Sequence, residues 1–344
     1  MTGDTSSTHR TESTGIALLL AAGILWSLNG ALIKLIYDEG RGPHGITIAF
    51  YRSLFAGLFL LPMAWGRFHT LRMGGQRSEG RRSEGQISES RRSGVPVPVR
   101  AGSRGPFSKM PAARGRIQPA AIWCVIFFAL MTVCFVVANT QTEAANAILL
   151  QYTSTFWVFG LSPWVLKERP AAREFRFLAL AMLGIAIIFA GNASTDLFGL
   201  LMALAAGLFF GLLTLMIRRL RHSDSAAITV LNNLGSALLL LPAALLVGDL
   251  SLSPRAWLLI ILMGAVQLGL PYYLYALGLA RVEAHRAALV TMIEPVLVPV
   301  WAYLAVQETV PGMTMAGGSL ILIALVLFIR SARRGSAAGA QDGA

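Results

Sequence analysis

The sequence predicts an all-α membrane protein in which ten transmembrane helices form two inverted five-helix repeats. Hydrophobic residues make up 55% of the 344 residues and charged residues only 13%, whereas soluble domains carry about 25% charged residues. Ten apolar segments approach the roughly 20 residues that cross a bilayer as a helix. The two halves of the chain also resemble each other. The net charge of +12 therefore does not indicate a soluble nucleic-acid-binding protein.

The ten apolar segments follow one another through most of the chain, joined mainly by short connections. Such connections suit antiparallel neighbours in a helical bundle. We expect the spans at 15–37, 46–66, 119–138, 144–166, 177–193, 197–217, 226–247, 256–280, 286–306 and 312–330.

The polar segments predict the orientation of the protein. Of the 29 basic residues, twelve lie in one loop at 67–117, which we expect to be disordered because it is polar and rich in Gly, Pro and Arg. Basic residues favour the cytoplasmic side, and alternating spans leave only Arg41 and Arg255 outside. We therefore expect cytoplasmic tails at 1–14 and 331–344, in a multi-pass protein of the bacterial inner membrane.

Three collinear matches relate residues 15–193 to residues 197–330. Gly23 corresponds to Gly207 at a shift of 184, and Glu143 to Glu283 at a shift of 140. Each copy has five spans, an odd number, so the second copy has the opposite orientation to the first. Inverted repeats are typical of secondary transporters, whose substrates bind between the copies near the middle of the membrane.

Charged residues inside the membrane are expensive to bury and are candidates for function. Glu294, near the middle of its span, could carry a proton, and Arg52 could pair with a carboxylate or hold an anionic substrate group. For either residue a purely structural role is the alternative. Pro295 removes a backbone donor and crowds the carbonyl of Thr291, which could then coordinate a substrate or an ion.

Further polar and aromatic side chains are expected at similar depth, where they would line a cavity and contact a small-molecule substrate. These candidates are Trp26, Asn29, Gln151, Ser154, Gln267 and Tyr272. Structural hydrogen bonding is an equal alternative for each of them. Glu143, Glu168, Glu283 and Glu308 are predicted to mark water-exposed helix ends, and His285 to lie at the membrane interface.

Several motifs together resemble the drug/metabolite transporter superfamily, in particular proteins with two EamA domains. They are the glutamates at span ends, Glu168 and Glu308, the segment 287–296 with Glu294 and Pro295, the segment 26–30 and the segment 50–52. The resemblance implies ten helices and the export or import of small organic solutes by alternating access. The sequence departs from it in two places: Ser154 stands opposite Glu294 in the repeat, and the basic loop is unusual.

The leading functional hypothesis is a secondary transporter, an exporter of small metabolites such as amino acids, with possible proton coupling. A non-transporting membrane receptor or scaffold is one alternative. An intramembrane enzyme is another, but no zinc-protease or serine-hydrolase motif is present. No cofactor-binding or metal-binding pattern stands out, and no nucleic-acid partner is expected. The sequence leaves the solute, the direction and the oligomeric state open.

Overall fold

A computed structural model describes residues 4–36, 42–71, 117–141, 144–190, 197–307 and 312–341. Within these ranges every regular element is a helix, so the prediction of an all-α protein is confirmed. The N-terminal half contains α1 (Asp4–Ser27), α2 (Asn29–Ile36), α3 (Gly45–Ala64), the 3-10 helix η1 (Phe68–Leu71), α5 (Pro119–Gln141), α6 (Ala144–Gln151), α7 (Ser154–Val165) and α8 (Ala172–Ala190).

The C-terminal half begins with two long uninterrupted helices and continues with interrupted ones. It contains α9 (Leu197–Arg219), α10 (Ser225–Val247), α11 (Pro254–Leu262), the π-helix η2 (Met263–Gly269), α12 (Leu270–Leu279), α13 (Ala284–Val290), the 3-10 helix η3 (Thr291–Ile293), α14 (Glu294–Val306) and α15 (Gly312–Gln341).

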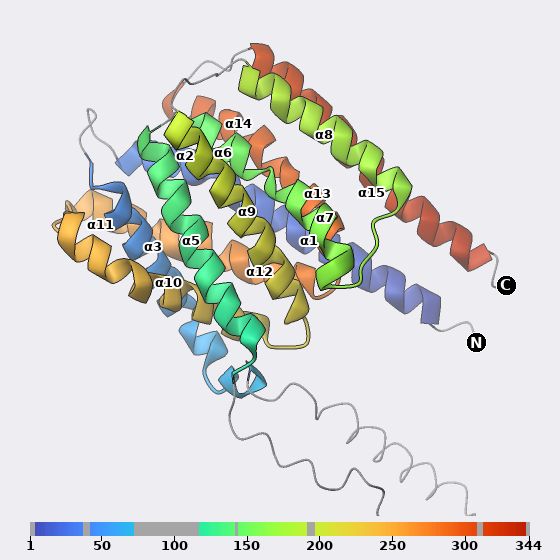
Figure 1. Ribbon diagram of the computed structural model, residues 1–344, viewed down its shortest axis with the longest axis horizontal. Coiled ribbons are helices and arrows are strands. Elements are labelled where there is room, and N and C mark those ends of the chain that lie inside the picture. The colour runs from blue at the N-terminus through green and yellow to red at the C-terminus, as the bar shows by residue number, and fades with distance from the viewer. Residues whose placement is uncertain are drawn as a thin grey trace, which may run out of the picture.

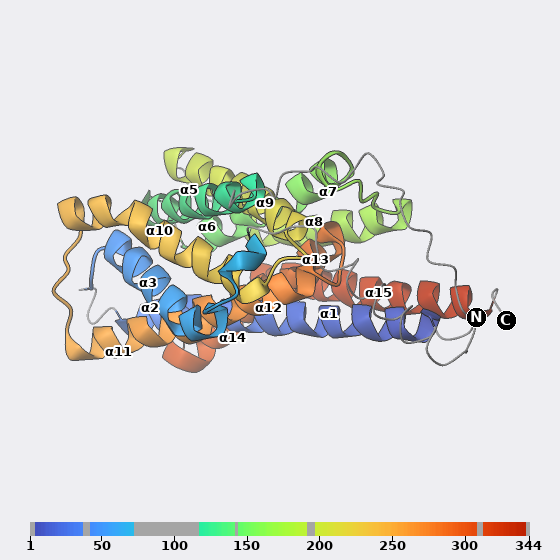
Figure 2. The ribbon, with the colours of Figure 1, turned by 90° about the horizontal axis from the view of Figure 1, so that it is seen from below.

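The helices of the two halves are interleaved rather than segregated. α5 packs against α9 and α10, α3 against α10, and α1 against α12 and α14. α8 and α15 run side by side at one edge of the bundle (Figure 1). The described ends of α1 and α15 lie at the same end of the molecule in both views (Figures 1 and 2). Every central space in the bundle is therefore bounded by both halves of the chain.

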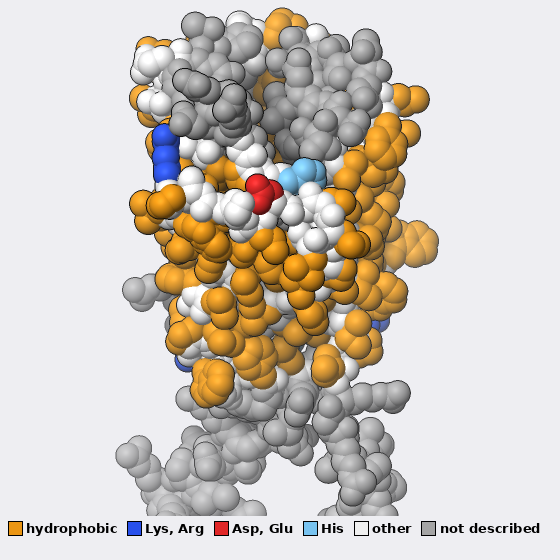
Figure 3. Space-filling model, turned by 90° about the vertical axis from the view of Figure 1, so that its left-hand side faces the viewer, with side chains coloured by type: hydrophobic (Ala, Val, Ile, Leu, Met, Phe, Trp, Pro, Cys, Tyr) orange, Lys and Arg blue, Asp and Glu red, His pale blue; other side chains and the backbone are white. Residues whose placement is uncertain are grey.

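The outer surface of the bundle suits a lipid environment. A broad band of hydrophobic side chains covers the face shown in Figure 3, and large apolar side chains such as Leu238, Leu246 and Leu258 are exposed. Eight helical segments of the described chain are long and apolar enough to cross a membrane. They correspond to eight of the ten predicted spans.

The other two predicted spans are an interrupted segment and a helix that begins with charged residues. The turn at Tyr152 and Thr153 divides the span at 144–166 into α6 and α7, neither of which could cross a bilayer alone. The span at 177–193 belongs to α8, whose first turn carries Arg173, Glu174 and Arg176. The count of ten spans therefore stays a prediction.

Four spans are interrupted in their middle part. α1 ends at Ser27 and α2 begins two residues later, α6 gives way to α7 at the Tyr152–Thr153 turn, and η3 separates α13 from α14. The fourth contains the seven-residue π-helix η2, a distortion that is frequent at functional sites. Tight local bonds close these interruptions, for example from Thr153 N to Leu150 O at 3.1 Å and from Thr155 N to Tyr152 O at 3.1 Å.

A glycine on a neighbouring helix covers two of the interruptions. A Cβ on Gly207 of α9 would lie 2.9 Å from the carbonyl oxygens of both Leu150 and Gln151, just before the α6–α7 turn. A Cβ on Gly23 of α1 would lie 2.6 Å from the side chain of Ile293 in η3. Small residues allow such close backbone approach between helices in lipid.

The polar segments contain more regular structure than their composition indicates, and the prediction of a disordered loop at 67–117 is wrong in part. α1 begins at Asp4 and α15 continues to Gln341, so residues of the predicted tails at 1–14 and 331–344 are helical. The loop at 67–117 begins with ordered residues, since Leu71 is buried and Arg67 pairs with Asp224 at 3.2 Å. Residues 72–116 lie outside the described residues.

We predict that Gly207→Ala destabilises the protein, because the added methyl group would meet backbone carbonyls that cannot rotate away. Overpacking of this kind costs about 1–3 kcal/mol. Gly160→Ala in α7 is the matched control, because a Cβ there meets nothing within 4 Å. Thermal unfolding of the purified variants in detergent should show a lower midpoint for Gly207→Ala only. Equal midpoints would show that α9 tolerates a side chain at this position.

Candidate functional site

A cavity of about 60 Å³ lies where the interrupted spans meet. By this measure one water molecule needs roughly 10–15 Å³, so the cavity holds a handful of waters. Seven of the nine predicted site residues line it. They are Trp26, Asn29, Arg52, Gln151, Gln267, Tyr272 and Glu294.

Arg52 enters the cavity from α3. One terminal nitrogen of its guanidinium donates a hydrogen bond of 2.9 Å to the side-chain oxygen of Asn29, at the start of α2. Its Nε is buried without a protein partner. The described residues contain no carboxylate within 4 Å of this guanidinium. Arg52 is thus held by a neutral amide and forms no contact ion pair with a carboxylate of the described residues.

Glu294 lies opposite, at the first residue of α14 where η3 ends. One oxygen of its carboxyl group accepts a hydrogen bond from the hydroxyl of Tyr152, in the α6–α7 turn. The cavity therefore contains a cation and an acid that do not form a contact ion pair with each other. An acid held only by a neutral phenol can gain and lose a proton without breaking a salt bridge.

Aromatic rings form the wall of the cavity beside these two groups. The indole of Trp26 lies 4.9 Å from the ring of Tyr272 and 6.0 Å from the ring of Phe210, centroid to centroid. Gln267, on the π-helix, donates from Nε2 to the backbone oxygen of Trp26 at 3.2 Å. Its Oε1 and the Nε1 of Trp26 are buried without a protein partner. These free groups could bind water or a ligand.

Two predicted site residues do not line the cavity. Ser154 is buried at the start of α7, and Pro295 is buried at the second residue of α14. Pro295 does not leave the carbonyl of Thr291 open, because that oxygen accepts a backbone hydrogen bond from Glu294 N. This carbonyl therefore already accepts one hydrogen bond, and its role in coordinating a substrate or an ion stays a prediction.

Sequence reasoning missed six residues that line the cavity: Met131, Thr132, Phe135, Tyr152, Phe210 and Leu268. Most are apolar and resemble ordinary lipid-facing or core residues in the sequence. Tyr152 had a detectable signal, because it directly follows Gln151 and is a polar aromatic residue at the depth of the other candidates.

A second polar network lies at the junction of α9, α12, α13 and the α7–α8 connection. Glu168 accepts hydrogen bonds from Nε of Arg218 at 2.6 Å and from the backbone N–H of Ala284 at 2.9 Å. Arg218 also donates to the backbone oxygen of Leu279 at 2.6 Å. Glu168 is only 8% exposed, so its prediction as a water-exposed boundary marker is wrong. Glu143 and Glu308 lie outside the described residues.

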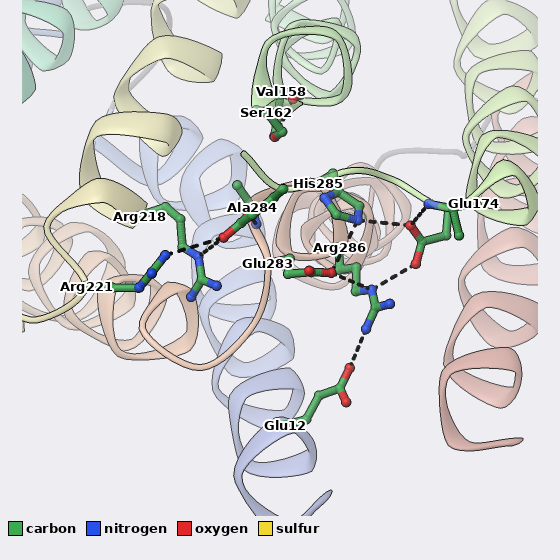
Figure 4. A network of polar contacts seen from close by, with 12 residues as sticks. Glu12, Val158, Ser162, Glu174, Arg218, Arg221, Glu283, Ala284, His285 and Arg286 are labelled. Atoms are coloured by element: carbon green, nitrogen blue, oxygen red, sulfur yellow. Dashed lines mark hydrogen bonds and ion pairs between the residues drawn. The ribbon is translucent and has the colours of Figure 1, made fainter. Parts of the chain in front are cut away.

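On the other side of the α13 start, Glu174 binds two side chains (Figure 4). It lies 2.9 Å from Nε2 of His285 and accepts from Nε of Arg286 at 2.8 Å. Arg286 also contacts Glu12 of α1 at 2.8 Å. His285 is fully buried at the start of α13, and its predicted interfacial position stays a prediction.

Glu174 is held in its charged form. It precedes the predicted span at 177–193, and burial alone would raise its pKa. The hydrogen bonds from His285 and from the backbone of Ala171, together with the charge of Arg286, outweigh burial and lower the pKa to about 2. Glu168 and Glu174 thus hold the start of α13 from two sides, and the low pKa of Glu174 keeps its carboxyl group charged at neutral pH.

The described part of the chain contains no group of three or more His, Cys, Asp or Glu side chains that could hold a metal ion. The cavity nevertheless offers a cation, an acid, unsatisfied hydrogen-bonding groups and aromatic surface. Interrupted helices around a polar cavity at membrane depth are the architecture of a membrane transporter.

Comparison with known proteins supports that class. Residues 197–330 match the EamA-like transporter family. A protein of Archaeoglobus fulgidus described as an uncharacterized transporter is 28% identical over 215 residues, which are 62% of this chain and 77% of that protein. The uncharacterized transporter YwfM of Bacillus subtilis is 26% identical over 223 residues, covering 62% of this chain and 75% of that protein.

A solved crystal structure of another protein has a TM-score of 0.70 with this chain, at 15% sequence identity, and covers 94% of this chain and 98% of its own. At that identity the likeness shows the fold alone. The family match and the two relatives confirm the resemblance found in the sequence. Residues 197–330 are thus similar to EamA-like transporters, and the findings support a membrane transporter.

The network around α13 generates a stability prediction. Glu168→Gln removes the charge that balances the buried Arg218, and losing one partner of a buried ion pair costs about 3 kcal/mol or more. Arg67→Gln, which breaks the ion pair between Asp224 and an Arg67 side chain that is 56% exposed, should cost under about 1 kcal/mol. Thermal unfolding in detergent measures both. A smaller loss for Glu168→Gln than for Arg67→Gln would contradict the assignment of Glu168 as a structural anchor.

Proposed function

We propose that this protein is a secondary active transporter that exports small organic metabolites by alternating access, with proton coupling through Glu294. The observation that carries the proposal is the placement of Arg52 and Glu294 in one cavity without a contact ion pair between them. A structural role would favour pairing the two charges, because unpaired charges at membrane depth are costly.

The position of the interruptions supports alternating access. Under the predicted shift of 140, Ser154 and Glu294 correspond, and each is the first residue after an interruption. Under the shift of 184, Gly23 and Gly207 correspond, and each packs against the interruption in the other half. This reciprocal packing is what an inverted repeat predicts. Rocking of one repeat against the other exposes a central site to each side in turn.

The chemistry of the cavity favours a small amphipathic solute with an anionic group, such as an amino acid or a related carboxylate. Arg52 offers a guanidinium that has no contact ion pair among the described residues, and this group matches carboxylate geometry. The free Oε1 of Gln267 can accept a hydrogen bond from an ammonium or hydroxyl group. Trp26 and its aromatic neighbours provide apolar surface for the rest of the solute.

The location of the protein follows from the same reasoning. The described ends of α1 and α15 lie at one end of the bundle (Figures 1 and 2), and Arg218, Arg219, Arg221 and Arg281 occupy helix ends or turns. Basic residues concentrate on the cytoplasmic side. We place both termini in the cytoplasm and the protein in a bacterial inner membrane.

We predict that Glu294→Gln abolishes uphill transport and its pH dependence, because an amide cannot carry a proton. Glu294→Asp, which keeps a titratable group, should retain both in reduced form. Proteoliposomes holding a pH-sensitive dye, exposed in turn to a panel of amino acids and short carboxylic acids, report proton flux driven by the solute. Unchanged flux in Glu294→Gln would remove Glu294 from the coupling role.

We predict that Arg52→Gln weakens transport of anionic solutes selectively, by about tenfold or more, because a buried charge-assisted hydrogen bond contributes about 1.5–3 kcal/mol. Arg52→Lys keeps the charge but loses the planar fork, so it should rescue only part of the activity. Competition among carboxylates and their amides in the same proteoliposomes separates the roles. An equal loss for neutral amides would indicate that Arg52 is structural.

A further inference from the structure

Tyr152 directly connects two of the interrupted spans, the one that contains α6 and α7 and the one that contains α13 and α14. It occupies the turn between α6 and α7, and its hydroxyl donates to the carboxyl group of Glu294 at the start of α14. The same hydroxyl lies 3.5 Å from the backbone oxygen of Thr291 in η3. A single phenol from one half of the chain thus reaches both the acid and the backbone of the interruption in the other half.

Backbone hydrogen bonds in the α6–α7 turn and the packing of α9 against that turn fix the position of this phenol. The backbone N–H of Tyr152 bonds to the carbonyls of Ile148 and Leu149 at 3.3 and 3.1 Å. The next residue, Thr153, donates to Leu150 O from its backbone N–H at 3.1 Å and from its hydroxyl at 2.6 Å. Gly207 lets α9 lie against the carbonyls of this turn. The Tyr152 side chain is 4% exposed, so it has little freedom to leave Glu294.

Few charged or titratable groups act on Glu294 besides Tyr152. From the elements around it, Arg52 of α3 and Tyr272 of α12 line the same cavity as Glu294. Glu12 of α1 is engaged by Arg286 at the other end of its helix. Tyr152 is the one side chain with a hydrogen bond to Glu294 among the described residues. A hydrogen bond donated to the charged form of an acid favours that form.

We propose that Tyr152 is a positioning residue, which orients the carboxyl group of Glu294 and stabilises its ionised form, so that the protonation state of Glu294 governs the contact between the two interrupted spans. The inference rests on the proposed coupling role of Glu294. When Glu294 is ionised, the phenol joins α14 to the α6–α7 turn. When Glu294 takes up a proton, the carboxyl group accepts this hydrogen bond less strongly and the two spans are held together less tightly.

The test uses the full-length protein and needs no substrate. Infrared difference spectra recorded across a pH titration follow the carbonyl-stretch band of protonated carboxylic acids, and the band that disappears in Glu294→Gln belongs to Glu294. In Tyr152→Phe the loss of a donor to the ionised form should move the midpoint of this band about one to two units toward higher pH.

Tyr275→Phe is the matched control. Tyr275 is also a buried tyrosine beside Trp26, but its hydroxyl pairs with Thr214 at 2.8 Å rather than with Glu294. In Tyr275→Phe the midpoint of the Glu294 band should stay at the wild-type value. Thermal unfolding of both variants checks that the fold persists. In proteoliposomes Tyr152→Phe should shift the pH profile of transport in the same direction while keeping measurable turnover.

The outcomes separate this inference from the proposed function. An unshifted infrared midpoint in Tyr152→Phe, or an equal shift in Tyr275→Phe, would overturn the role of Tyr152 whatever the transport data show. A shifted midpoint in Tyr152→Phe together with unchanged proton flux in Glu294→Gln would support the role of Tyr152 and contradict the coupling role of Glu294.

Discussion

The structure depends on the requirement that polar backbone groups at membrane depth find partners inside the protein. Water cannot satisfy them in the hydrocarbon region, so a helix can be interrupted there only if the interruption closes on itself or on neighbouring residues. This protein does both. Ser27 and Thr153 return their hydroxyls to carbonyls three residues earlier, at 2.6 Å in each case, and Gly23 and Gly207 bring neighbouring helices against the interruptions.

Charged groups in the bundle fall into two kinds that differ in how fully they are paired. Around the start of α13, Glu168 and Glu174 each accept hydrogen bonds from an arginine and from a backbone N–H. In the cavity, the Nε of Arg52 has no partner and Glu294 has one, the hydroxyl of Tyr152, among the residues that the structure describes. Ion pairs and hydrogen bonds offset the desolvation cost of the charges at the start of α13 fully, but they offset the cost in the cavity only in part. Under the proposed function, the groups left without a partner in the cavity are the ones that a ligand or a proton would bind.

The sequence could predict what depends on local pattern. Spans followed from apolar length, and Glu294, Arg52 and Gln267 stood out because polar groups are rare at membrane depth. What the sequence could not predict depends on contacts between distant segments. Glu168 looked like a helix-end marker because its partner Arg218 is 50 residues away. Glu174 was not singled out, because its partner His285 is 111 residues away. Tyr152 lacked a visible role because its partner, Glu294, lies 142 residues further on.

The size of the cavity constrains how the protein works. At about 60 Å³ it holds a handful of waters, whereas pockets for small molecules usually have several times that volume. Under the proposed function, a metabolite enters only when the side chains that form the cavity wall move apart. Trp26, Tyr272 and Phe210 form that wall by edge contacts of their rings; Trp26 precedes the α1–α2 interruption and Tyr272 follows η2. Trp26 and Tyr272 lie beside interruptions, whereas Phe210 lies within the long helix α9. Under the proposed alternating access, a small change in the angle between the helical pieces that carry Trp26 and Tyr272 would separate their rings from Phe210. The interruptions would then supply polar groups of the site, such as Asn29 and Glu294, together with the freedom to open it.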